Sequence, residues 1–279
     1  MKDMTTKNPP KLIASDLDGT LLDDLAHLSK ENISAVFEMT ARGALFVPTT
    51  GRALYEIIKE VRDLECVRYL ITSNGARVYD KKTGGSIETL ICKEDFSAIY
   101  DIMKDYTVYL TVHHEGMTFV DEELSASESM EYYNISEYYK EHIKKTCVKM
   151  PNFKDYFATP RAVEMVCGFF KYESELKACI ERLSVLPSLF VTSSSSGSIE
   201  ILSAKATKGA ALSSLANSLG IDVCDTVAVG DSPNDLAMIR SAGLGLATAN
   251  ASDSVKACAD GIVCSNNENV AVHLLRELF

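Results

Sequence analysis

Apolar runs alternate with amphipathic segments in the N-terminal part of the chain. Residues 11–15 form a short apolar run that predicts a strand, and residues 29–43 carry apolar side chains at helical spacing. Ser29 is the expected N-cap of that helix, and Gly43 is its expected stop. A strand, a helix and a further strand are predicted to follow, at 44–50, 53–64 and 68–75. This order of elements predicts a parallel sheet that is flanked by helices.

The C-terminal part of the chain returns to the same alternation. Strand-like runs and helical segments follow one another here, and a final amphipathic helix is expected from about Asn269. The predicted elements before that helix lie at 226–230, 235–243, 244–248, 253–259 and 261–264. Because the two ends of the chain are alike in kind, we expect them to form one α/β core with a Rossmann-like parallel sheet.

The middle of the chain follows a different pattern. Two predicted strands, 107–114 and 116–121, are separated only by turn-like residues, which favours an antiparallel or mixed sheet. Two more strands and two helices are predicted in this region, at 161–170, 188–194, 94–106 and 172–183. These elements predict an α+β domain of their own.

Turn-rich stretches bound this middle region. The stretch at 80–86 precedes it and the stretch at 193–197 follows it, and neither is long enough for a disordered linker. We therefore expect core segments at 1–82 and 197–279, with an inserted cap domain at 83–196 between them.

Composition narrows the range of partners. The formal net charge is −11 and the pI is about 5.0, which opposes binding to nucleic acid and to anionic lipid. The basic pairs at 81–82 and 144–145 are isolated. The N-terminus lacks the apolar stretch of a signal peptide, and no charge-free apolar run has the length of a bilayer. We therefore expect a cytoplasmic protein without a nucleic-acid or membrane partner, and no feature implies a protein partner.

Acidic side chains follow two of the predicted strands of the core. Asp16 and Asp18 come directly after the first strand, and Asp231 and Asp235 follow the strand at 226–230. Ligands of open parallel sheets bind beyond the carboxyl ends of the strands, so these carboxylates should share a small volume. Each pair of like charges about 4 Å apart costs about 4 kcal/mol at a moderate effective dielectric constant. Such a cluster needs a cation, and its oxygen ligands favour Mg²⁺.

Four short motifs carry a resemblance to a known family. They are DLDGT at 16–20, TGR at 50–52, KG at 208–209 and GDSPND at 230–235. Together they resemble the four motifs of the haloacid dehalogenase superfamily of phosphatases. The insertion after the third strand is similar in position to the cap of the Cof-like subfamily. Members of that subfamily are mostly hydrolases of sugar phosphates and other small phosphoesters.

The resemblance implies roles for the acidic residues. Asp16 would attack phosphorus and form an aspartyl-phosphate, and Asp18 would act as general acid and then as general base. Mg²⁺ would be held by Asp16, by the main-chain carbonyl of Asp18 and by Asp231. Asp235 would reach the ion directly or through water.

The resemblance also implies a phosphate-binding set. Thr50, Gly51 and Asn234 would contact the phosphoryl oxygens. Lys208 would do so from the first turn of a helix that Thr207 caps, where the helix dipole also favours an anion. Lys208 taken singly has a plainer interpretation as a solvated helix residue.

Several other polar residues have two interpretations. Asn74 is either a substrate contact near the cap junction or part of an Asn-Gly hairpin turn. Arg52 is expected to be structural. His113 and His114 are consecutive in a strand, where side chains point to opposite faces, so an ordinary strand pair is favoured over a metal pair. Glu164 is a candidate for lining the inner face of the cap, as is the nearby Arg161.

The function that follows is a Mg²⁺-dependent phosphatase acting on small phosphorylated metabolites, sugar phosphates foremost. A phosphomutase of the phosphomannomutase type shares the same core and is the nearest alternative. A non-enzymatic phosphosugar-binding regulator is a further alternative, although such a module would typically lack Asp16 or Asp18, and both are present.

Overall fold

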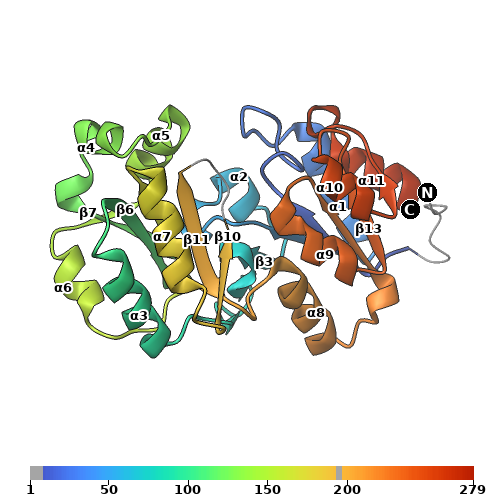
Figure 1. Ribbon diagram of the computed structural model, residues 1–279. Helices are drawn as coiled ribbons and strands as arrows, with labels where there is room; N and C mark the ends of the chain where they lie inside the picture. The colour runs from blue at the N-terminus through green and yellow to red at the C-terminus, as the bar shows by residue number, and fades with distance from the viewer. Residues whose placement is uncertain (1–8, 193–196) are drawn as a thin grey trace. The chain divides into compact units, whose positions relative to one another are not determined.

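The structure is a computed structural model, and it describes residues 9–192 and 197–279. The chain divides into two compact units, which Figure 1 shows in ribbon form. The first unit consists of the chain up to Arg52, Ile57–Ile87 and Thr207–Phe279, and the second of Ala53–Glu56 and Glu88–Ala206.

The first unit is built on an eight-stranded sheet of order β14-β13-β12-β1-β2-β3-β4-β5. The strands from β14 to β3 are parallel, and β4 joins β3 in the antiparallel sense. The strands are β1 (Leu12–Asp16), β2 (Leu45–Thr49), β3 (Tyr69–Thr72), β4 (Arg77–Asp80), β5 (Ser86–Glu88), β12 (Thr226–Gly230), β13 (Leu244–Ala247) and β14 (Gly261–Ile262). The predicted parallel α/β core is therefore confirmed.

Helices bury the central strands of this sheet. Every residue of β1 and β12 is buried, as expected where helices cover both faces of a parallel sheet. Ser29 caps the helix α1 as predicted, because its hydroxyl accepts the amide hydrogen of Asn32. The helices are α1 (Lys30–Ala41), α2 (Lys59–Arg62), α8 (Lys208–Ser218), α9 (Leu236–Ser241), α10 (Asp253–Cys258) and α11 (Val270–Leu278).

The helix predicted at 53–64 does not form as one element. A 3-10 turn, η1 (Leu54–Glu56), is followed by the short helix α2, and Ile58 between them has extended backbone angles. The amide of Tyr55 bonds to the carbonyl of Gly116 in the second unit instead of to its own helix. The local sequence of residues 53–64 favours a helix, but the tertiary contacts of residues 53–56 impose a different backbone.

The second unit is built on a six-stranded sheet of order β10-β11-β9-β6-β7-β8. It is mixed, as predicted, because β7 and β8 are parallel and the other neighbours are antiparallel. Its strands are β6 (Val108–His114), β7 (Met117–Asp121), β8 (Val148–Met150), β9 (Met165–Phe170), β10 (Leu189–Thr192) and β11 (Ser198–Ser203). The last residues of the strand predicted at 188–194, and most of the turn at 193–197, lie outside the described residues.

Apolar clusters lie on both faces of the second sheet. Phe96 of α3 and Leu183 of α7 pack with Val112 and Val166 in one cluster. Tyr109 packs with residues of α4 and α5 in another. The helices are α3 (Lys93–Met103), α4 (Ser127–Tyr132), α5 (Glu137–Thr146), α6 (Phe153–Ala158) and α7 (Glu173–Leu183), with the 3-10 turn η3 (Glu122–Leu124).

The second unit extends beyond the boundary expected at residue 196. Strand β11 pairs with β9 and β10, and its residues Ile199 and Ile201 are fully buried in the apolar cluster of α3 and α7. The unit therefore reaches Ala206, and it begins at Glu88, a few residues after the expected start at residue 83. Among the helices of residues 9–192 and 197–279, none has both the length and the apolar character that a bilayer span requires.

Candidate active site

The site lies at the carboxyl ends of neighbouring parallel strands of the first unit. Asp16 is the last residue of β1, Thr50 follows β2, and Asp231 follows β12. Strand β1 lies between β12 and β2 in the sheet, so the three strand ends are adjacent. The topology thus gathers side chains that are far apart in sequence, as expected for an open parallel sheet.

A buried lysine joins two of the aspartates. The ammonium nitrogen of Lys208 lies 2.5 Å from Oδ1 of Asp16 and 2.7 Å from Oδ1 of Asp235. Lys208 is 1% exposed and Asp235 is 0% exposed, so water screens these contacts little. Lys208 is the first residue of α8, which is capped by the Thr207 hydroxyl, as predicted. The interpretation of Lys208 as a solvated helix residue is therefore wrong.

The remaining oxygen of Asp235 organises the loop that carries Asp231. Oδ2 of Asp235 accepts the amide hydrogens of Asp231 and Ser232, each at 3.0 Å. Ser232 and Asp235 form a reciprocal capping box at the start of η5 (Pro233–Asp235). A Cβ at Gly230 would lie 2.5 Å from the Asp235 side chain, so this loop needs glycine there. Both oxygens of Asp235 are thus bonded within the protein.

The carboxylate of Asp231 is held by two hydroxyl groups. The Thr20 hydroxyl donates to Oδ1 at 3.0 Å, and the Ser232 hydroxyl donates to Oδ2 at 2.9 Å. Gly19 has a φ of +78°, and a Cβ there would lie 2.7 Å from Oδ2 of Asp231. Glycine in the DLDGT motif therefore serves both the turn and the close approach of Asp231.

Burial and the charges of neighbouring groups shift the pKa values of the cluster. Burial raises the pKa of the Asp16 carboxyl well above its usual range, the charge of Asp235 adds to the rise, and Lys208 opposes it. Burial and Asp235 also raise the pKa of Asp231. Burial alone would lower the pKa of Lys208, but Asp16 and Asp235 raise it overall. The lysine is thus held charged while the carboxylates repel one another.

The residues of the cluster fit a divalent cation. Asp16, Asp231 and Asp235 each offer a carboxylate oxygen, and these three oxygens lie within 4.8 Å of one another. Hard oxygen donors of this kind suit Mg²⁺. Asp235 bonds to the Lys208 ammonium and to two loop amides, Asp231 bonds to two hydroxyl groups, and Oδ1 of Asp16 bonds to Lys208, so each carboxylate keeps lone pairs for an ion.

Asp18 has a different partner from the other aspartates. Nε of Arg52 lies 2.8 Å from Oδ2 of Asp18, and Nη2 lies 2.5 Å from Oδ1. The Asp18 side chain is 42% exposed and that of Arg52 is 12% exposed. The backbone amide of Arg52 also donates to the Thr50 hydroxyl at 3.2 Å. Arg52, which was expected to be structural, thus holds both oxygens of Asp18.

Asn74 and Asn234 lie together beside the second motif. Nδ2 of Asn234 donates to Oδ1 of Asn74 at 3.0 Å, and the amide of Asn74 donates to the carbonyl of Thr50. A Cβ at Gly51 would lie 3.0 Å from Oδ1 of Asn74. Asn74 lies in the left-handed region, in the turn η2 (Ser73–Gly75) that joins the antiparallel pair β3 and β4. The turn interpretation of Asn74 is therefore correct, and the same turn contacts the predicted phosphate-binding residues.

Some residues that support the site were missed in the sequence. Thr20 and Ser232 hold Asp231, and Nδ2 of Asn250 donates to the carbonyl of Gly19 at 2.7 Å. Asn250 follows β13, so the rule of polar residues at the ends of parallel strands could have found it. Thr20 carried no such signal beyond its place in the motif.

The polar candidates of the second unit have structural partners. Oε1 of the fully buried Glu164 accepts the amide hydrogen of Gly116 at 2.7 Å, in the turn between β6 and β7. The guanidinium of Arg161 stacks on the ring of Tyr156 at 3.5 Å. His114 contacts aromatic rings, including that of Tyr156. These contacts explain the three residues without a substrate.

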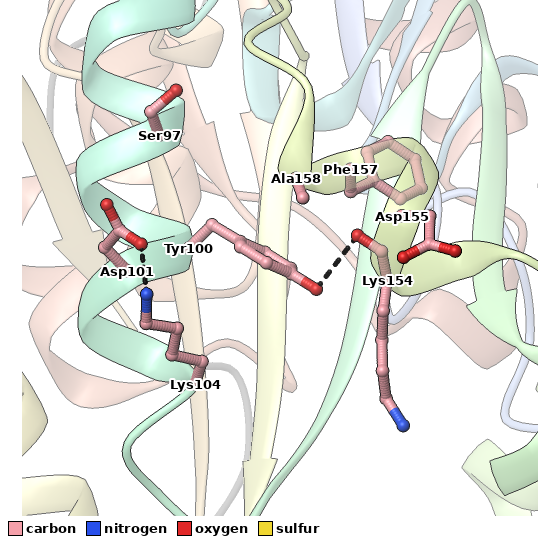
Figure 2. Close-up of a pocket in the computed structure, with 8 residues that line it drawn as sticks. All are labelled: Ser97, Tyr100, Asp101, Lys104, Lys154, Asp155, Phe157 and Ala158. Atoms are coloured by element: carbon pink, nitrogen blue, oxygen red, sulfur yellow. Dashed lines mark hydrogen bonds and ion pairs between the residues drawn. The ribbon is translucent and has the colours of Figure 1, made fainter.

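The second unit also contains a small cavity beside α3 and α6, shown in Figure 2. Its volume is about 300 Å³, and Tyr100 spans it to donate to the carbonyl of Lys154. Lys104 pairs with Asp101 at 2.5 Å, and Lys154 pairs with Asp121 at 3.6 Å. The two lysines that line this cavity therefore already have acidic partners.

Comparisons with known proteins cover nearly the whole chain. A family model described as haloacid dehalogenase-like hydrolase matches residues 13–275. Phosphatase YwpJ of Bacillus subtilis is 29% identical over 96% of this chain and 99% of that protein. The 5-amino-6-(5-phospho-D-ribitylamino)uracil phosphatase YwtE of the same organism is 31% identical over 96% of this chain and 98% of its own.

A solved structure agrees with the sequence relatives. A haloacid dehalogenase-like hydrolase from B. subtilis superposes with a TM-score of 0.80 and 28% sequence identity. The superposition covers 96% of this chain and 100% of that chain.

Removal and addition of Mg²⁺ should change stability through the carboxylate cluster. At a free Mg²⁺ concentration about 100 times the dissociation constant, the free energy of unfolding should rise by about 2.7 kcal/mol. Asp231→Asn should lose this gain, whereas Asp253→Asn, an exposed change at the start of α10, should keep it. Thermal unfolding with chelator and with Mg²⁺ measures the gain in stability of each variant. An equal gain in the unchanged protein and in Asp231→Asn would contradict a metal site at Asp231.

The raised pKa of Asp16 gives the sign of a pH effect. The folded chain binds the Asp16 proton more tightly than the unfolded chain, so folding without metal loses stability as pH rises above the ordinary carboxyl pKa of about 3.9. Asp16→Asn carries no such proton and should show a smaller loss of stability up to about pH 7. Thermal unfolding of both proteins in chelator tests this, and parallel pH profiles would refute it.

Proposed function

Because the chain belongs to the haloacid dehalogenase-like hydrolases and is a phosphatase, we propose that it hydrolyses small phosphorylated metabolites, sugar phosphates foremost, in a Mg²⁺-dependent reaction. One observation carries the proposal. Asp16, Lys208 and Asp235, all buried, and the half-buried Asp231 lie in one cluster at the carboxyl end of a parallel sheet. This arrangement combines a nucleophile, the fixed ammonium group of Lys208 and a set of oxygen ligands for a metal ion.

Asp16 is the proposed nucleophile. Lys208 binds Oδ1, so the other oxygen attacks phosphorus while the bond from phosphorus to the ester oxygen breaks. The product of this step is an aspartyl-phosphate at Asp16 and a released alcohol. Water then attacks phosphorus, the bond to Asp16 breaks, and inorganic phosphate leaves. Two displacements replace one difficult displacement.

Asp18 is the proposed acid and base. In the first step its proton goes to the ester oxygen of the leaving alcohol, and in the second step its carboxylate takes a proton from the attacking water. A positioned group of this kind typically contributes a factor of about 10² to 10⁴ in rate. Its partial exposure, 42%, agrees with a group that must meet substrate and water.

Mg²⁺ would be held by Asp16, Asp231 and the main-chain carbonyl of Asp18, with Asp235 behind them. When bound, it reduces the repulsion between the carboxylates and the incoming phosphate and neutralises charge on the transferred group. Asp235 acts on the site through Lys208 and through the amides of Asp231 and Ser232.

The phosphoryl oxygens are bound by donors from three loops. Lys208 supplies a charged donor, and Thr50 supplies its hydroxyl with the adjacent Gly51 amide. The amide group of Asn234 is oriented by Asn74 and adds a donor from the fourth motif. Fixed donors of this kind stabilise the charge of the transferred group without reorganisation during the reaction.

The names of relatives guide the choice of substrate. YwtE and YcsE of Bacillus subtilis, 31% and 28% identical to this chain, are both named 5-amino-6-(5-phospho-D-ribitylamino)uracil phosphatases. That compound is a phosphate monoester of a sugar alcohol side chain. We therefore place phosphate monoesters of sugars and sugar alcohols first among the candidate substrates.

Replacement of the nucleophile should abolish turnover without loss of the fold. Asp16→Asn keeps the size of the side chain but removes the attacking oxyanion, so kcat should fall by a factor of about 10³ or more. Asp23→Asn, in the same segment and at a half-exposed side chain, is the matched control and should retain activity. Initial rates are measured on a purified, folded sample. Residual activity of more than a few per cent, where about 0.1% is expected, would contradict the covalent mechanism.

A panel of metabolites tests hydrolysis and substrate class together. With Mg²⁺ present, free inorganic phosphate should appear from sugar and sugar alcohol monophosphates, among them 5-amino-6-(5-phospho-D-ribitylamino)uracil, and kcat/KM should be highest in this class. A phosphomutase would instead isomerise the sugar phosphate and need a sugar bisphosphate for turnover. Isomerisation without release of phosphate would therefore refute the proposed hydrolysis.

A further inference from the structure

A buried glutamate anchors a short segment that directly follows the second motif. Residues Ala53–Glu56, here called the strap, belong to the second unit, although Arg52 before them and Ile57 after them belong to the first. Glu56 is 5% exposed. Burial of a carboxylate is costly unless the group is paired and hydrogen-bonded, and Glu56 has several partners.

The partners of Glu56 come from α5 and its C-cap, from β6 and from the strap itself. Oε1 lies 3.1 Å from Nε2 of His142 on α5, and the Cys147 thiol donates to it at 3.7 Å. Oε2 lies 4.0 Å from Nε2 of His113 on β6, and it accepts the amide hydrogen of Ala53 at 2.9 Å. Burial would raise the pKa of Glu56, but His142 and His113 lower it overall, to about 2. The carboxylate is therefore ionised and fixed.

The backbone of the strap is also fixed to the second unit. The amide of Tyr55 donates to the carbonyl of Gly116 at 3.0 Å, in the turn between β6 and β7. The amide of Gly116 in turn donates to the buried carboxylate of Glu164 at 2.7 Å. The side chain of Leu54 is buried against Gly116. Side chains and backbone thus hold the strap at several points.

Arg52, the residue before the strap, is fixed to the first unit instead. Its guanidinium occupies both carboxylate oxygens of Asp18, and its carbonyl accepts the amide hydrogen of Ser73. This fork-shaped contact uses one lone pair of each Asp18 oxygen and fixes the orientation of the carboxylate, which keeps lone pairs for a further partner. The position of Arg52 therefore sets the orientation in which the proposed acid and base meets the substrate.

We propose that Glu56 is a positioning residue that acts on Asp18 through Arg52. The inference rests on the proposed function only in assigning Asp18 as acid and base. Because the strap is anchored within the second unit and is covalently joined to Arg52, loss of an anchor in the strap is transmitted along the chain to the contact of Arg52 with Asp18. Glu56 holds the strap through His142, His113 and the amide of Ala53, and it thereby keeps Arg52 and Asp18 in one orientation.

A double-mutant cycle separates this role from a structural one. Glu56→Gln retains the shape but removes the charge that His113 and His142 face, and it should lower kcat about tenfold with KM changed less than about twofold. In an Arg52→Ala background the same change should alter kcat by less than about twofold, because the path to Asp18 is already cut. The loss of thermal stability should be similar in both backgrounds.

The control is a second buried carboxylate of the same unit. Asp121 is 5% exposed, accepts the amide hydrogen of Glu123 and pairs with Lys154 at 3.6 Å. Asp121→Asn should leave kcat within about twofold of the unchanged enzyme. If Glu56→Gln does not fold, His142→Gln removes the imidazole partner of Glu56 and should give the same dependence on Arg52.

A measurement that needs no turnover keeps this inference distinct from the proposed function. Amide hydrogen exchange of the loop at 17–22 is followed by mass spectrometry, and it should become about fivefold faster in Glu56→Gln than in the unchanged protein. Addition of Glu56→Gln to the Arg52→Ala variant should not make this exchange faster than in Arg52→Ala alone. Unchanged exchange in this loop would overturn the role of Glu56, as would an equal loss of kcat in both Arg52 backgrounds. Absence of any phosphatase activity would refute the proposed function and leave the exchange result to decide the strap.

Discussion

Repulsion between buried carboxylates is the constraint on which the structure of the site depends. Asp16, Asp231 and Asp235 offer oxygens within 4.8 Å of one another, and the lysine ammonium of Lys208 compensates only part of that charge. Without a further cation, burial and mutual repulsion raise the pKa values of Asp16 and Asp231. The cluster thus fits a divalent cation, whose charge would reduce this repulsion.

The surrounding loops hold the three carboxylates close together despite their repulsion. Glycines at positions 19 and 230 allow Asp231 and Asp235 to approach the backbone closely, where a Cβ would lie 2.7 Å and 2.5 Å from their side-chain atoms. Asp235 satisfies two loop amides with one oxygen and Lys208 with the other. A residue that resembles a metal ligand in the sequence is therefore also the support of the loop that presents Asp231.

The sequence predicted the core and the site where local pattern and topology agree. Strand ends were sufficient to bring Asp16, Asp231 and Asp235 together, because parallel strands align their carboxyl ends. Lys208 was placed with them only by the resemblance of its motif. The helix expected at 53–64 does not form as one element, because the strap makes its contacts within the second unit instead. The pairing of β11 with β9 and the contact of Arg52 with Asp18 also depend on partners remote in sequence, which no local pattern reveals.

The central claim is that Asp16 carries the phosphoryl group during turnover, and chemical trapping tests it most directly. Enzyme quenched during turnover with a sugar phosphate and Mg²⁺ is treated with borohydride, which reduces an acyl phosphate to the corresponding alcohol. Digestion and mass spectrometry then locate the modified residue. We expect homoserine at position 16 and none in enzyme quenched without substrate. Release of phosphate without any trapped residue, or trapping at another aspartate, would contradict it.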